Sequence, residues 1–164
     1  MRTRLLSGGT WVCGKTIVPE GLTGPQLSFN FTVRKSKFGG ELMGINIEQT
    51  RQYYTEIKTE DLCDCDYCKN FYLQVKEAYP LVADYLNALG VDIEKPLETS
   101  PLEPVNGMLE YCVCQYVVFG KTSGELVKKI GNVELGVATS YPRTNIQREH
   151  FVIDIYPIKL NWIM

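Results

Sequence analysis

The sequence lacks a long apolar run, a large excess of either charge and, apart from one residue, histidine. No stretch approaches the roughly 18 apolar residues that a membrane span requires, and the segment after Met1 lacks the apolar core of a signal peptide. Seventeen Lys and Arg residues against nineteen Asp and Glu residues leave a formal net charge of -2, which is too small to attract a phosphate backbone. We therefore expect a cytoplasmic protein that binds neither a membrane nor nucleic acid.

The length and composition are those of one ordinary soluble domain. A chain of 164 residues can bury roughly two-thirds of the surface that its unfolded form exposes, so it needs no disulfides to fold. Hydrophobic residues make up 45% and charged residues 22%, average proportions that argue against disorder and against a fibrous repeat. We expect residues 1–164 to form a single domain.

Alternating apolar and polar residues predict strands in both halves of the chain. The pattern is clearest at residues 27–33, where every second residue is apolar. Together with β-forming composition and turn residues, it predicts strands over residues 10–18, 27–33, 42–57, 108–119, 133–139 and 147–156. Residues 92–106 contain three prolines and few large apolar residues, so we expect an ordered linker there.

Apolar residues recur at steps of three and four between residues 69 and 89, the spacing of one helical face. Asp64 or Asp66 is suited to cap the start of this helix, and Gly90 to close its end. Pro80 lies in the middle and predicts a kink, or a break into two short helices. The order of elements predicts an α+β domain: a mainly antiparallel or rolled sheet covered by one long helix.

Residues 9–16 match the phosphate-loop pattern of nucleotide hydrolases letter for letter. That loop requires a helix that begins at its lysine, here Lys15, and directs its positive end at the phosphates. Pro19 and the glycines that follow oppose such a helix. We therefore expect a strand in this segment and no nucleotide binding.

Three of the six cysteines lie within six residues, at the entrance to the predicted helix. Cys65 and Cys68 have the C-x-x-C spacing that can present two thiolates to one zinc ion, and Cys63 precedes them. Cys112 and Cys114 are predicted on the same face of a strand and would supply further ligands. These five residues are the metal ligands that the sequence predicts.

Two other interpretations of the cysteines remain open. A C-x-x-C pair at a helix start can catalyse thiol-disulfide exchange, although Asp61, Asp64 and Asp66 would oppose thiolate formation. Alternatively, the cysteines are small buried core residues without chemistry. Elsewhere, His150 is expected at an exposed strand start, and nothing places the carboxyl groups of Glu94 and Glu98 in one cleft.

The segment CDCDYCKNF at residues 63–71, with LGVDIEKP at residues 89–96, resembles a segment of uncharacterised bacterial proteins. The resemblance covers about a quarter of the chain and implies a bacterial cytoplasmic protein without supplying an activity. From the residues themselves we expect a non-enzymatic binding or interaction domain, with an unidentified protein or small-molecule partner and a structural zinc site. The alternative is a small thiol-disulfide oxidoreductase that uses Cys65 and Cys68.

Overall fold

The fold is built on an antiparallel sheet of six strands. The structure, a computed structural model, describes residues 4–6, 10–12, 44–122 and 127–164. The sheet has the order β3-β4-β7-β6-β5, and β8 pairs with β4 outside this path. Its strands are β3 (Glu98–Pro101), β4 (Met108–Phe119), β5 (Lys128–Ile130), β6 (Val133–Val137), β7 (His150–Tyr156) and β8 (Ile158–Asn161). The predicted antiparallel α+β class is thereby confirmed.

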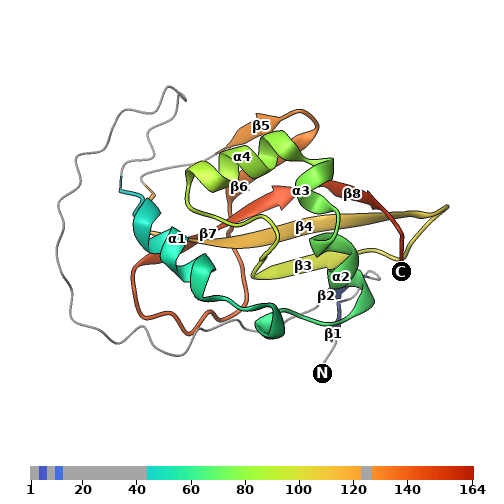
Figure 1. Ribbon diagram of the computed structural model, residues 1–164, viewed down its shortest axis with the longest axis horizontal. Coiled ribbons are helices and arrows are strands. Elements are labelled where there is room, and N and C mark those ends of the chain that lie inside the picture. Colours follow the sequence, from blue (N-terminus) through green and yellow to red (C-terminus); the bar gives the residue numbers. More distant parts are fainter. Residues whose placement is uncertain (1–3, 7–9, 13–43, 123–126) are drawn as a thin grey trace.

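The long strand β4 organises this sheet (Figure 1). Both β7 and β8 pair with it in succession and in continuous register, from Phe119↔His150 to Met108↔Asn161. The strand β3 also pairs with β4. A separate hairpin of β1 (Arg4–Leu6) and β2 (Thr10–Val12) places β2 against β3. Three strands, β3, β7 and β8, therefore pair with β4.

The prediction of one long helix over residues 69–89 is wrong, although the break that was the alternative at Pro80 is present. Three short helices cover the region, α2 (Asp66–Tyr72), α3 (Val75–Ala78) and α4 (Pro80–Ala88). Pro80 has no backbone N–H and takes the first position of α4, where no donor is needed. The residue before α2 is Cys65, so neither aspartate is its N-cap. Gly90 does follow the end of α4, with a φ of 84°.

The apolar face of that region is nevertheless buried as its spacing predicts. Phe71, Val75, Val82 and Leu86 belong to the core, although they come from three helices. A buried tyrosine hydroxyl group fastens this layer to the sheet: Tyr111 on β4 donates to the Tyr67 carbonyl oxygen of α2 at 2.7 Å. Figure 1 shows α2, α3 and α4 arranged along one face of the sheet.

The strand predicted over residues 42–57 is also wrong, because α1 (Ile47–Glu56) occupies most of it. Its buried residues Thr50, Tyr53 and Tyr54, followed by buried Ile57, have helical spacing. Asn46 is the N-cap, and its Oδ1 accepts a hydrogen bond from the Gln49 N–H at 3.0 Å. In the sequence prediction, the β-forming composition of the segment outweighed both the helical spacing and the N-cap.

The importance of this cap can be measured. Replacing Asn46 by alanine should lower the free energy of unfolding by about 1 kcal/mol, because the first turn of α1 loses its acceptor. Urea unfolding of the two proteins measures the difference. The exposed Gln52→Ala variant, in the middle of the same helix, should change stability by less than about 0.5 kcal/mol. Equal effects of the two changes would contradict a role for the cap.

The remaining predictions concern strands in both halves of the chain and the linker between them. The strand predicted over residues 108–119 is confirmed, and β6 and β7 lie within the predicted ranges 133–139 and 147–156. The linker predicted over residues 92–106 is wrong in part, because it contains the buried edge strand β3. In the first half, Thr10–Val12 is a strand; the rest of the phosphate-loop match and the strand predicted over 27–33 lie outside the described residues.

Candidate metal centre

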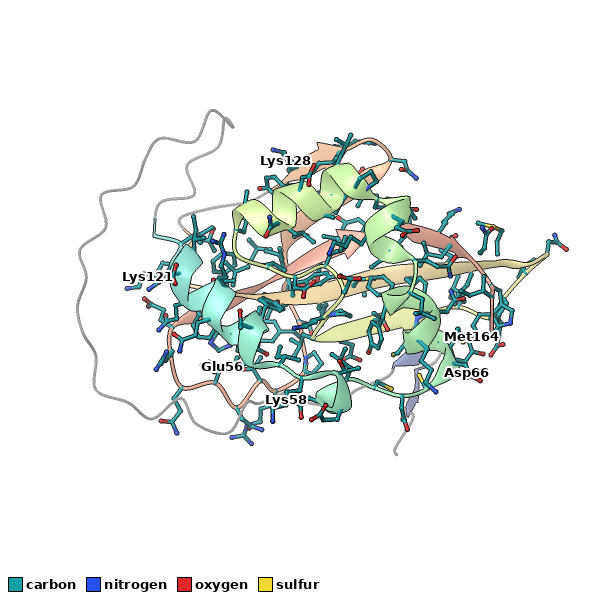
Figure 2. The ribbon with its side chains drawn as sticks, viewed as in Figure 1. Glu56, Lys58, Asp66, Lys121, Lys128 and Met164 are labelled. Carbon is teal, nitrogen blue, oxygen red and sulfur yellow. The ribbon has the colours of Figure 1, made fainter. Side chains whose placement is uncertain are left out.

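Three of the five predicted ligands come together. The Sγ atoms of Cys63, Cys65 and Cys68 all lie within 4.8 Å of one another. Cys63 stands in the connection that follows the short 3-10 helix η1 (Thr59–Asp61), Cys65 is the N-cap of α2, and Cys68 follows one turn later. Figure 2 labels Asp66, with which α2 begins, at the rim of the molecule.

The cluster has a buried side and a side nearer to solvent. Cys68 is 2% exposed, and its Sγ lies 3.6 Å from the Thr99 Oγ1 on strand β3. Cys63 and Cys65 are half-buried. The group is therefore anchored on the sheet through Cys68 and accessible through the other two thiols.

Contacts with the sheet and the C-terminal end of the chain hold the first turn of α2 in place. The Tyr111 hydroxyl, on β4, donates to the Tyr67 carbonyl oxygen at 2.7 Å and accepts from the Asn70 amide at 3.3 Å. The ring of Tyr67 also packs on Trp162, with ring centroids 5.3 Å apart. A fixed helix start gives Cys65 and Cys68 fixed positions, which is what a preformed ligand pair requires.

Cys112 and Cys114 are not part of the group of sulfur atoms. Between the pairs Thr99↔Cys114 and Pro101↔Tyr111, two steps on β3 correspond to three on β4, so β4 carries a bulge. The bulge leaves Cys112 exposed and Cys114 buried. The prediction that they share one face is therefore wrong.

The environment of Cys114 also disfavours a thiolate. Burial, and then the neighbouring Cys68, raise the pKa of the Cys114 thiol well above its usual value. Burial, followed by the charge of Glu110, raises the pKa of Cys112 as well. A raised pKa makes deprotonation, which metal binding requires, less favourable at both residues.

The geometry of the three sulfur atoms suits a zinc ion after a small contraction. Sulfurs bound to zinc at about 2.3 Å lie about 3.8 Å apart along the edge of a tetrahedron. Separations of up to 4.8 Å thus need to shorten by about 1 Å, which side-chain rotation can supply. Three thiolates provide three corners, and a fourth ligand must come from outside this group.

The single histidine lies apart from this chemistry. His150 begins β7, as the sequence predicts, but it is half-buried and not exposed as expected. Its Nε2 lies 2.9 Å from the Thr144 Oγ1, and its Nδ1 lies 2.7 Å from the Arg148 carbonyl oxygen. Both ring nitrogens are thus engaged by the neighbouring loop.

The sequence analysis did not predict that Glu98 is buried, because the residue fell in the predicted linker. Glu98 begins β3 and is 5% exposed, and neither carboxylate oxygen has a hydrogen-bond partner within the described part of the chain. Burial raises its pKa from 4.5 to about 7. No local sequence signal marks it, because its burial depends on the tertiary structure around β3.

Comparison of the chain with protein-family models, with curated protein sequences and with solved structures found no match. Among the described residues, no helix is long and apolar enough to cross a membrane. The resemblance to a segment of bacterial proteins stays a prediction. Any function must therefore be inferred from the geometry of the sites themselves.

Proposed function

We propose that the protein is a non-enzymatic binding or interaction domain in which Cys63, Cys65 and Cys68 hold a structural zinc ion. The observation that supports this is the convergence of the three Sγ atoms within 4.8 Å at a helix entrance. Thiolates select zinc and other thiophilic ions over magnesium or calcium, which prefer oxygen ligands. The protein or small molecule that the domain binds is not identified by this site.

A metal ion here would act structurally because of where the cluster lies. The connection between η1 and α2 has no regular secondary structure at Cys63, while Cys68 touches β3 through Thr99. An ion bound to both would tie this connection to the edge of the sheet. The cytoplasmic location belongs to the same proposal, since thiols stay reduced in that compartment.

The alternative, a thiol-disulfide oxidoreductase, is supported by the order of exposure within the pair. Cys65 is half-buried and reachable, whereas Cys68 lies buried behind it, an arrangement suited to attack through Cys65 and resolution by Cys68. Asp64 and Asp66 flank Cys65, and their negative charges oppose the thiolate that such chemistry needs. We therefore place metal binding first.

Elemental analysis of protein purified without chelator tests the metal site. We expect about one zinc ion per chain, and its loss in Cys63→Ser, Cys65→Ser and Cys68→Ser, because each variant removes one thiolate. Cys112→Ser is the matched control: this exposed cysteine lies outside the group, so zinc should be retained. Serine variants of Cys13 and Cys114 then show whether either supplies the fourth ligand.

Thermal unfolding separates the two functions. If zinc is structural, its binding energy is folding energy, so a chelator should lower the melting temperature while a mild reductant should not. The opposite pattern, with zinc far below one per chain and a reducible Cys65–Cys68 bond, would favour the oxidoreductase. An absence of both responses would contradict both functions and leave the cysteines as ordinary small residues.

A further inference from the structure

A row of polar residues crosses the sheet on the face opposite to α2. Glu98 on β3 is paired with Gln115 on β4, and Gln115 is paired with Asp154 on β7. Residues paired across neighbouring strands point to the same face. The adjacent row, Thr99 to Cys114 to Ile155, points to the other face, where Thr99 meets Cys68 of α2. The row is therefore separate from the metal centre.

The polar atoms of the row that are left without a hydrogen bond are mainly acceptors. The Gln115 Nε2 donates to the Asp154 Oδ1 at 2.8 Å and to the Ser140 carbonyl oxygen at 2.9 Å. This uses both N–H groups of the amide. Both oxygens of Glu98 remain without a partner, although the residue is 5% exposed. Within the described residues, none of the ion pairs includes Glu98 or Asp154.

An unpaired buried carboxylate is costly, so this row is complementary to a ligand that brings positive charge and N–H donors. Glu98 is buried whereas Asp154 is half-buried, so the row is more exposed at its Asp154 end. A ligand that approaches from that end must be small to reach Glu98. Burial raises the pKa of both carboxyl groups, as expected when no cation accompanies them.

The arrangement of donors in a ligand decides how much of the row it can satisfy. Glu98 and Asp154 are rooted two strand spacings apart, about 10 Å, because neighbouring strands lie about 4.8 Å apart. A guanidinium group carries five N–H donors in a planar fork, so each of its two sides can pair with one carboxylate. A magnesium or calcium ion, which takes oxygen ligands, is the competing occupant that the test below separates.

We propose that Glu98, Gln115 and Asp154 bind the guanidinium group of a small molecule. In this arrangement the Glu98 carboxylate pairs with one side of the planar cation, and the free Oδ2 of Asp154 accepts from the other. Gln115 positions Asp154 through the bond from its amide. The site stands independently of the zinc site, which lies on the opposite face of β3.

Isothermal titration with L-arginine tests the proposal, with L-citrulline as the matched control. Citrulline has the same backbone and length but a neutral end group. We expect saturable binding of arginine below about 10 mM and none of citrulline. Glu98→Gln and Asp154→Asn should each weaken arginine binding by about tenfold or more, because each removes a charged acceptor. Glu110→Gln, on the exposed part of β4, should bind as the parent protein does.

Three results would overturn the proposal: no saturable arginine binding, equal binding of citrulline, or unchanged binding by a Glu98→Gln variant that melts cooperatively. Competition of arginine by magnesium or calcium at equal concentration would also overturn it, because the row would then be a metal site. Cys65→Ser protein should bind arginine normally. That result separates failure of this site from failure of the zinc site.

Discussion

Replacing Leu86 by alanine should lower the free energy of unfolding by about 2–5 kcal/mol. Leu86 lies in α4 with 0% of its surface exposed and belongs to the core cluster between the helices and the sheet. Alanine would remove three buried carbon atoms and leave a cavity that the close-packed surroundings fill only in part. Urea unfolding, followed by far-UV circular dichroism, measures the change.

Leu81 provides the matched control, because it lies on the same helix and is 69% exposed. Leu81→Ala should change the free energy of unfolding by less than about 0.5 kcal/mol, since it removes no buried contact. The two variants have the same chemical change and the same helical context, so their difference reports burial alone. Similar losses of stability in both would show that α4 does not cover the core as described.

These two leucines also show what the sequence could predict. The period of three and four marks Leu86 as core without any knowledge of the partner strands, because periodicity reports which face is apolar. Pro80 indicated one of the two breaks, but nothing in the sequence marks the other at Gln74, because the apolar face continues across it. Hydrophobic pattern and backbone continuity are separate properties, and the pattern reports only the first.

The strand predicted over residues 42–57 was wrong for a different reason. Its isoleucines and tyrosines favour strands by composition, whereas their spacing from Thr50 to Ile57 and the cap at Asn46 favour a helix. Tertiary packing decides between such competing tendencies: Thr50 accepts a hydrogen bond from the Phe119 N–H, and Tyr54 donates to the Val117 carbonyl oxygen. These bonds need β4, which lies more than 60 residues away in sequence.

The candidate sites also differ in whether local sequence spacing could predict them. Cys63, Cys65 and Cys68 are neighbours in sequence, so local spacing was sufficient to predict that they meet. Cys112 and Cys114 were misplaced because a β-bulge, invisible in the sequence, changes which residues of β4 are buried. The row of Glu98, Gln115 and Asp154 requires the register of three strands, and no local pattern contains that information.

Replacing Glu98 by glutamine should raise the free energy of unfolding relative to the parent protein at about pH 8. This gain should be about 3 kcal/mol larger at about pH 8 than at about pH 5. Burial raises the pKa of Glu98 from 4.5 to about 7 in the folded protein. Between these values the folded state binds a proton that the unfolded state has released, so the stability of the parent protein falls as the pH rises. The loss is nearly complete at about pH 8, where Glu98 is ionised in both states.

Glutamine has nearly the same shape and cannot ionise, so the variant should not lose this stability. The measurement is the free energy of unfolding of both proteins in urea across this pH range, in the absence of any guanidinium compound. Glu110→Gln is the control, because Glu110 is partly exposed and paired with Lys159 at 2.9 Å. The Glu110→Gln change should leave the pH dependence of the parent protein almost unchanged.

A Glu98→Gln variant that loses stability with rising pH as steeply as the parent would show that Glu98 is solvated, or paired with a cation, in the folded protein. In either case the carboxylate would not be the unpaired group on which the guanidinium site depends.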